Sequence, residues 1–220
     1  MEGGLVSCAR DNCVSQHDHI ITGHFDGTIT LNIEEADPVI REEIRTRMQE
    51  SYRTLLGHLR HESGHYYWHK VITTPELIAE FNVLFGDQNK DYKTALEHYY
   101  ETGPSYNWST NYITAYASAH PLEDWAESWA HYLHMIDTME TAYDFGIDIS
   151  ASNKAKQLPR IDKKYLVSIT AEELIDDWSD FSIALNEMNR SMGLADAYPF
   201  FISKVVKEKL VFIQKVITAR

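Results

Sequence analysis

The sequence predicts a mainly α-helical domain with a small β-sheet near its start, an α+β arrangement. Long stretches carry apolar residues at helical spacing, and one short stretch alternates apolar and polar residues as a half-buried strand does. The chain has 220 residues, of which 44% are hydrophobic and 12% aromatic. That is enough apolar material for one core, so a single globular domain is expected.

The strand pattern occupies Thr28–Ile33, where the letters TITLNI alternate with a period of two. The preceding Asp26-Gly27 pair is a strong signal for a tight hairpin turn. We therefore expect two short strands around this turn, within HIITGHFDGTITLNI.

A helical pattern begins at Pro38, a residue suited to the first position of a helix. We expect this helix to run to about Trp68, because no proline interrupts it before Pro75. Gly57 and Gly64 lie within the pattern, and such glycines can mark places where a neighbouring element packs closely.

Further helices are expected downstream, each bounded by a proline, a glycine or a capping residue. They are a short helix closed by Gly103-Pro104, a long one from Pro121 to about Gly146, one from the capping pair Thr170 and Glu173 to Gly193, and a last one from Pro199. The polar segment at 148–168 is expected to be a long loop or a joint between subdomains.

The charge balance disfavours one class of partner, the nucleic acids. With 33 acidic and 20 basic residues the formal net charge is −13, which disfavours nucleic-acid binding.

The start of the chain has no signal-peptide pattern and no apolar run suits a membrane span, so we expect a cytoplasmic protein without a membrane partner. Cys8 and Cys13 make neither a four-ligand zinc ribbon nor a disulfide framework and are expected to be reduced.

The stretch GHLRHESGHYYWH places His58, His61, His65 and His69 on one helical face. Its inner letters HESGH match H-E-x-x-H, in which two histidines one turn apart present their imidazoles to one metal ion. Glu62 then flanks the metal without binding it, where a carboxylate can take a proton from a metal-activated water. His58 and His69 are expected at the surface or behind the ligands.

A second stripe lies on the helix HPLEDWAESWAHYLH, where His120, Glu123, Glu127, His131 and His134 share one face. The plainer interpretation is the solvated side of an amphipathic helix. Two ligand-type faces in one chain nevertheless provide the three protein ligands and the open position that a catalytic zinc ion needs. A metal site is the favoured hypothesis.

The third ligand is expected to be Glu123, because it lies in the first helical turn, where the helix dipole favours an ionised carboxylate. Glu127, one turn further, would then accept the distal N–H of a ligand histidine and fix its tautomer. Two alternatives stay open: Glu127 on the metal with His131 behind it, or His131 itself as the third ligand. The predicted set is therefore one Zn²⁺ on His61, His65 and Glu123, with Glu127 and His131 behind them.

Four segments, taken in order, resemble the bacterial zinc-binding metallopeptidase family. They are TGHFDGTITLNIEEAD, YRTLLGHLRHESGHYYW, SAHPLEDWAESWAHYLH and LNEMNRSMGLADAYPFFISKVVKEKL. The resemblance covers about residues 20–215 and implies a zincin-like catalytic domain over 20–220. Within it we expect a metal-site half at 20–147 and a C-terminal helical part at 169–220, after an extension at 1–19. Longer members carry a cysteine-rich segment ahead of this domain, so the extension is expected to be a shortened version.

A more distant similarity is to the catalytic domain of anthrax lethal factor. There the metal-binding glutamate opens a helix in the pattern E-x-x-A-E, and EDWAE has this form. The similarity implies Glu123 on the metal and Glu127 behind it. It also implies that Tyr116, seven residues before the ligand, stabilises the oxyanion. The alternative for Tyr116 is one more buried aromatic residue.

Together these observations predict a zinc-dependent metallopeptidase of gluzincin-like type, with Glu62 as the general base. The expected substrate is a peptide or protein, held by main-chain hydrogen bonds against the edge of the strand at Thr28–Ile33. The alternative is a catalytically silent zincin-fold module that binds zinc and acts in regulation or protein binding.

Overall fold

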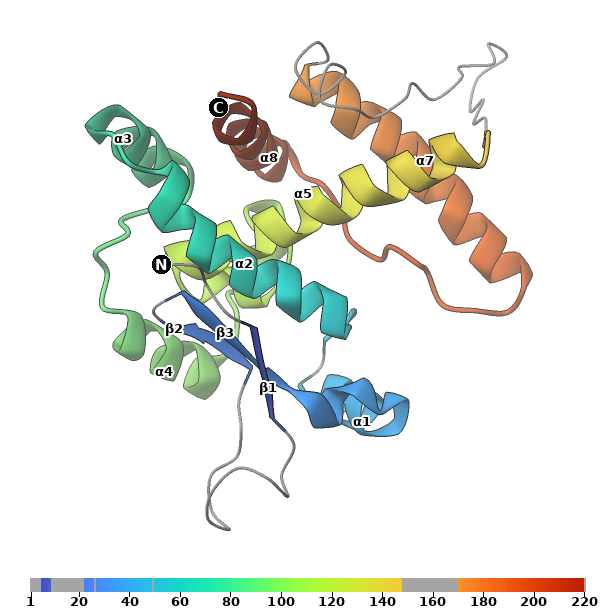
Figure 1. Ribbon diagram of the computed structural model, residues 1–220, viewed down its shortest axis with the longest axis horizontal. Helices are drawn as coiled ribbons and strands as arrows, with labels where there is room; N and C mark the ends of the chain where they lie inside the picture. Colours follow the sequence, from blue (N-terminus) through green and yellow to red (C-terminus); the bar gives the residue numbers. More distant parts are fainter. Residues whose placement is uncertain (1–4, 9–21, 26, 49, 148–169, 220) are drawn as a thin grey trace.

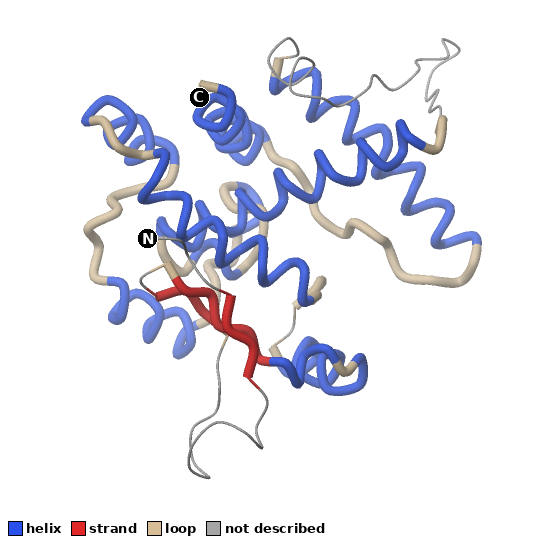
Figure 2. The backbone as a smooth tube through the Cα atoms, in the orientation of Figure 1, coloured by secondary structure: helices blue, strands red, loops and turns tan. Residues whose placement is uncertain are grey.

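The computed structural model describes residues 5–8, 22–25, 27–48, 50–147 and 170–219. These form a mostly helical molecule with a small sheet on one side, as Figures 1 and 2 show. The α-helices are α1 (Pro38–Arg47), α2 (Leu55–Val71), α3 (Pro75–Leu84), α4 (Tyr92–Thr102), α5 (Pro121–Asp144), α7 (Ala171–Ser191) and α8 (Lys204–Thr218). Short 3-10 helices are η1 (Ile33–Ala36), η2 (Trp108–Thr110) and η3 (Tyr116–Ser118). The predicted fold class is confirmed.

The sheet contains β1 (Leu5–Cys8), β2 (Gly23–Phe25) and β3 (Thr28–Asn32) in the order β1-β3-β2. β2 and β3 form the predicted antiparallel hairpin, and Gly27 adopts the positive φ of 77° that its turn requires. β1 comes from the segment expected to be an extension and pairs parallel with β3.

The expectation that β3 offers its edge to a substrate is wrong. β3 is the middle strand, and its two sides are paired with β1 and with β2. A strand paired on both sides has no free row of backbone N–H and C=O groups for a further chain. Within the described sheet, the outer edges belong to β1 and β2.

The single helix expected from Pro38 to Trp68 is two helices, so that prediction is also wrong. α1 ends at Arg47, and Arg45 donates a hydrogen bond to the carbonyl oxygen of Glu50 beyond its end. The hydroxyl of Thr54 then caps the start of α2. The break is made by side-chain contacts, which apolar periodicity does not register.

The other predicted helix boundaries are largely confirmed. α4 ends at Gly103 with a φ of 73°, α5 begins at Pro121, and α7 begins with the capping box of Thr170 and Glu173. α8 begins at Lys204, later than the expected Pro199. Its first turn is capped by Ser203, whose hydroxyl accepts a hydrogen bond from Val206 N. The expected loop at 148–168, Cys13 and the side chain of Cys8 lie outside the described residues.

α2 lies between the sheet and α5, α8 packs on the other side of α5, and α7 packs on α8 (Figure 1). The core is built largely from aromatic and aliphatic side chains of these helices and of α3, among them Phe81, Trp125, Met135, Trp178, Leu210 and Phe212. Within the described residues, no helix is both long and apolar enough to cross a membrane.

A buried ion pair connects α8 to α5. Lys209 Nζ lies 2.6 Å from Asp124 Oδ2, and both side chains are almost completely inaccessible to solvent. Lys209 also donates to the backbone carbonyl of Asn111. Burial raises the pKa of Asp124 to about 7 although Lys209 opposes the shift. This pair fixes the first turn of α5, which also carries Glu123.

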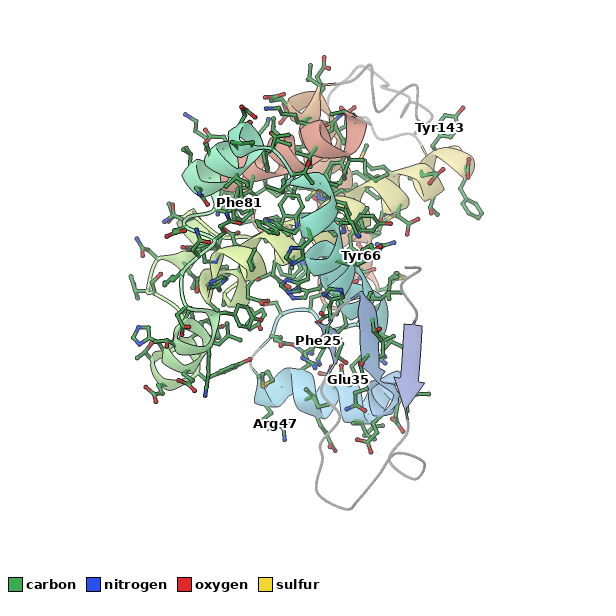
Figure 3. All side chains as sticks on the ribbon, turned by 60° about the vertical axis from the view of Figure 1, so that its left-hand side comes forward. Phe25, Glu35, Arg47, Tyr66, Phe81 and Tyr143 are labelled. Atoms are coloured by element: carbon green, nitrogen blue, oxygen red, sulfur yellow. The ribbon has the colours of Figure 1, made fainter. Side chains whose placement is uncertain are left out.

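A second buried carboxylate connects the sheet side of the molecule to α2. Glu35 is 4% exposed and accepts two hydrogen bonds from Arg53, at 2.8 and 3.1 Å. Its Oε2 also lies 3.0 Å from His58 Nδ1. Figure 3 shows Glu35 toward the start of α2 and Phe81 toward its other end. Burial alone would raise the pKa of Glu35, but His58 and Arg53 outweigh it and lower the pKa to about 2.

Replacing Glu35 with Gln is expected to lower the free energy of unfolding at pH 7 by about 3 kcal/mol, because Arg53 loses its buried partner. The folded-state pKa lies below the ordinary 4.5, so the contribution of Glu35 is complete above that pH and is lost as the pH falls toward about 2. The difference in unfolding free energy between wild type and E35Q should therefore shrink over this range in urea titrations.

Glu42→Gln is the matched control, since Glu42 pairs with Arg45 on the exposed surface. We expect it to change the unfolding free energy little. An equal effect of E35Q and E42Q, or a difference that does not depend on pH between 4.5 and 2, would contradict the assignment.

Candidate metal centre

The site depends on a close approach of α2 and α5 at Gly64. A Cβ atom added to Gly64 would lie 2.9 Å from Ala126 Cα and 3.2 Å from Trp129 Cβ, so the two backbones are nearly in contact. Trp125 Nε1 donates to the carbonyl oxygen of Gly64 at 2.9 Å. The close packing expected at this glycine is confirmed, and it turns the histidine face of α2 toward the acidic face of α5.

Three side chains converge where the helices cross. His61 Nε2 and His65 Nε2 are 3.2 Å apart. Glu123 directs one oxygen to each of them: Oε2 lies 3.0 Å from His61 Nε2 and Oε1 lies 3.4 Å from His65 Nε2. Ligand atoms at about 2.0–2.1 Å from a tetrahedral zinc ion are about 3.3 Å from one another, so these separations suit zinc. One ligand atom from each residue lies within 4.8 Å of the other two.

A second layer fixes the tautomer of His61. Its Nδ1 lies 2.6 Å from Glu127 Oε1, and Thr114 Oγ1 donates to Glu127 Oε2 at 2.7 Å. An ionised carboxylate only accepts hydrogen bonds, so Nδ1 carries a proton and Nε2, on the side of His65 and Glu123, is the nitrogen left to bind an ion. Glu127 thus makes the contact that the sequence analysis expected of it. Thr114 was not foreseen, because nothing in its local sequence distinguishes it from other threonines.

The electrostatics of the cluster favour a positive charge between these groups. Burial raises the pKa of Glu123, but its interactions with His61 and His65 lower it by more. The pKa of Glu123 is therefore well below its usual range. Burial lowers the pKa of His61, but Glu123 and Glu127 raise it above its usual range. The same pair of carboxylates would stabilise a bound cation in place of a proton.

Glu62 lies beside this cluster and is 8% exposed. Burial raises the pKa of Glu62, the charge of Glu123 adds to the effect, and His61 and His65 oppose it. Among the residues that the structure describes, no protein group donates a hydrogen bond to its carboxylate. The carboxylate is therefore free to exchange a proton with a small molecule beside the histidines.

Tyr116 is brought to the same place by η3. Its ring centroid lies 6.0 Å from that of His61 and 5.8 Å from that of Tyr99 on α4. Burial, followed by the charge of Glu123, raises the pKa of Tyr116. Its hydroxyl therefore keeps its proton at neutral pH and can donate a hydrogen bond.

His131 and His134, on the second stripe, contact groups outside the three converging side chains. His131 Nδ1 lies 2.9 Å from Tyr198 Oη, so its hydrogen bond goes to the C-terminal segment instead of to a candidate ligand. Burial lowers the pKa of His131 to about 4. His134 contacts Arg60 at 2.6 Å, and His69 is exposed.

The sequence analysis missed Tyr92 altogether and did not foresee the contacts of His120. Tyr92, at the start of α4, donates its hydroxyl proton to Glu123 Oε1 at 2.5 Å. His120 caps α5 by accepting from Leu122 N and lies 3.0 Å from the carbonyl oxygen of Lys90. Tyr92 and His120 flank Glu123 from the outside. No motif in the sequence marks Tyr92, whereas His120 belongs to the stripe predicted on the helix HPLEDWAESWAHYLH.

An H-E-x-x-H helix crossed by a helix that carries a carboxylate is an arrangement typical of zinc-binding metallopeptidases. The chain belongs to the family described as "Putative zinc-binding metallo-peptidase", whose model matches residues 5–216. The resemblance inferred from the four sequence segments is thereby confirmed.

Similar proteins include uncharacterised proteins of Mycobacterium bovis and of two strains of Mycobacterium tuberculosis. Each is 42% identical over 204 residues, which are 92% of this chain and 58% of the relative. The chain thus spans about three fifths of the length of these relatives. No solved structure matches it, so the distant similarity to anthrax lethal factor has no further support.

Replacing Gly64 with Ala tests the close approach. Helix propensity alone would make this change stabilising by about 1 kcal/mol. Because the new Cβ would overlap Ala126, we expect instead a loss of about 2–3 kcal/mol of unfolding free energy in the metal-free protein. Zinc affinity should fall as well, since α5 must move away from α2.

Gly23→Ala is the matched control, because a Cβ there would meet nothing within 4 Å. It should leave zinc affinity unchanged. A G64A protein that is as stable as wild type and binds zinc equally well would show that the two backbones are further apart than described.

Proposed function

We propose that this protein is a zinc-dependent metallopeptidase in which His61, His65 and Glu123 hold one Zn²⁺. The observation that carries the proposal is the convergence of these side chains, with each oxygen of Glu123 at 3.0–3.4 Å from one imidazole Nε2. Membership of a zinc-binding metallopeptidase family supports the same assignment and implies a peptide or protein substrate.

A bound zinc ion supplies Lewis-acid chemistry, which acidifies water and polarises a scissile carbonyl. Three protein ligands leave a fourth position open, as hydrolysis requires. Glu127, hydrogen-bonded to His61 Nδ1 and Thr114, holds His61 in the tautomer that directs its Nε2 lone pair into the site.

Glu62 is the general base in this proposal. Its carboxylate, which no protein donor engages within the described residues, accepts the proton of the attacking water and then delivers it to the leaving amine. Tyr116 donates its hydroxyl hydrogen to the oxyanion that develops at the carbonyl. The position of Tyr116 supports this role, because its ring centroid lies 6.0 Å from that of His61.

Glu62→Gln separates chemistry from metal binding. The amide keeps the size of the side chain but cannot accept the proton, so peptide hydrolysis should fall at least about 1,000-fold while zinc content stays at one ion per chain. The measurements are cleavage of a proteome-derived peptide library, read by mass spectrometry, and elemental analysis. Wild-type protein that binds zinc and cleaves nothing would instead support a silent zinc-binding module.

Glu123→Ala and Glu127→Ala distinguish ligand from supporting carboxylate. E123A should abolish stoichiometric zinc binding, because only two histidines then remain. E127A should still bind zinc, with an affinity lower by about 10–100-fold. Competition with a chelator of known affinity measures both, and the opposite order of effects would assign the metal to Glu127.

A further inference from the structure

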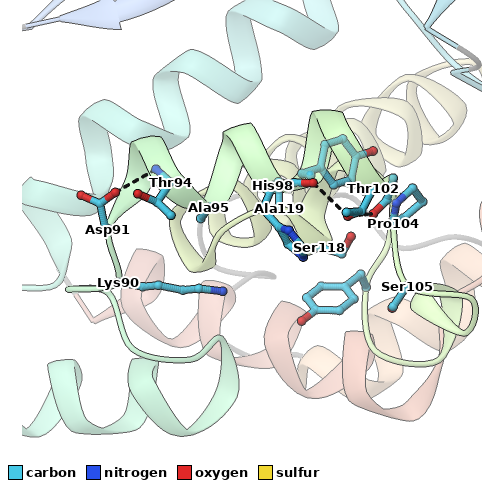
Figure 4. A pocket seen from close by; sticks show the side chains of 13 residues that line it. Lys90, Asp91, Thr94, Ala95, His98, Thr102, Pro104, Ser105, Ser118 and Ala119 are labelled. Carbon is cyan, nitrogen blue, oxygen red and sulfur yellow. Dashed lines mark hydrogen bonds between the residues drawn. The ribbon is translucent and has the colours of Figure 1, made fainter.

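α4 lies beside the candidate metal centre and is only partly packed against the protein. Of its 11 residues, Ala95 is the buried one. One face of α4, with Thr94, Ala95 and His98, borders a cavity of about 610 Å³ (Figure 4). The far wall of this cavity includes Tyr112, Ser118 and Ala119. A helix that borders a cavity on one side has few apolar contacts there to fix its position.

A hydrogen bond connects α4 directly to the candidate ligands. Tyr92 is 43% exposed, whereas Glu123, which accepts its hydroxyl proton, is 1% exposed on its side chain. The tyrosine thus reaches from the surface to a buried carboxylate oxygen, Oε1. The other oxygen, Oε2, is buried and lies 3.0 Å from His61 Nε2 without the geometry of a hydrogen bond.

A second bridge joins the same two elements. Because His120 Nδ1 accepts from Leu122 N, its Nε2 carries the proton and donates to the carbonyl oxygen of Lys90 at 3.0 Å. The ring of His120 also meets the ring of Tyr92 edge to face, with centroids 5.0 Å apart. The first bridge connects the start of α4 to Glu123 in the first turn of α5, and the second connects Lys90, two residues before α4, to the residue that caps α5.

We propose that Tyr92 is a positioning residue for Glu123, and that docking of α4 and metal binding are therefore coupled. The hydrogen bond holds Oε1 and so orients Oε2 toward the histidines before any ion arrives. Coupling between two binding events is reciprocal, so the factor by which docked α4 raises zinc affinity equals the factor by which zinc favours docking. This inference rests on the proposed function, because it takes Glu123 to be a zinc ligand.

Zinc affinity of the full chain tests the positioning role. We expect Tyr92→Phe, which removes one oxygen atom, to weaken zinc binding about tenfold in chelator competition. Tyr106→Phe is the matched control, since Tyr106 is fully exposed, and should bind zinc as wild type does. In the cobalt(II)-substituted protein, Y92F should also change the visible absorption bands, because the carboxylate is held differently; a merely structural tyrosine would leave them unchanged.

Hydrogen exchange tests the coupling. Zinc should slow amide exchange across 92–102 in the wild-type protein, and this protection should be smaller in Y92F. His120→Asn provides a second variant, because asparagine still caps α5 but gives up the ring that bonds Lys90; it should reduce zinc-dependent protection as well.

The outcomes separate the two proposals. Wild-type protein that binds no zinc refutes the proposed function and this inference with it. Zinc binding in the wild type, with unchanged affinity, cobalt spectrum and α4 protection in Y92F, overturns this inference alone. If circular dichroism shows that Y92F does not fold, the comparison is made between wild type and H120N. Smaller zinc-dependent protection of 92–102 in H120N supports the coupling, and equal protection overturns it.

Discussion

The contact between the backbones of α2 and α5 at Gly64 is the constraint on which the rest of the site depends. With a Cβ at this position the helices would have to separate, because Ala126 Cα would be only 2.9 Å away. The carbonyl of Gly64 is also held by Trp125. This close approach brings Glu123 on α5 within 3.0–3.4 Å of the imidazole Nε2 atoms of His61 and His65 on α2. The glycine inside the H-E-x-x-H segment therefore serves the geometry of the site and not its chemistry.

The first turns of α5 carry three carboxylates that are at least half-buried, and each has different partners. Glu123 faces two imidazoles and Tyr92, Glu127 accepts from His61 and Thr114, and Asp124 pairs with Lys209. A buried carboxylate without such partners would be strongly destabilising. The arrangement separates the contacts along one helix: Glu123 faces two imidazoles, Glu127 orients His61, and Asp124 anchors the helix to α8.

Elements on opposite sides of α2 and α5 are joined to these two helices by buried ion pairs. The sheet side is joined to α2 through Glu35, Arg53 and His58, and the C-terminal helices are joined to α5 through Lys209. α4 is the exception, since it borders a cavity and reaches the centre through Tyr92. A rigid pair of crossed helices with one loosely packed neighbour is an arrangement in which ion binding and local order can influence each other.

The sequence by itself determined the features that follow from local spacing. Two histidines four residues apart fix the relation of His61 to His65, and the turn and capping residues fixed the hairpin and the starts of α5 and α7. Only the tertiary structure decided which carboxylate faces both imidazoles, because Glu123 and Glu127 lie one turn apart on the same face. It also decided the break between α1 and α2, the central place of β3 and the contact of Tyr92 with Glu123. These depend on contacts between residues far apart in the chain, which periodicity and local propensity do not encode.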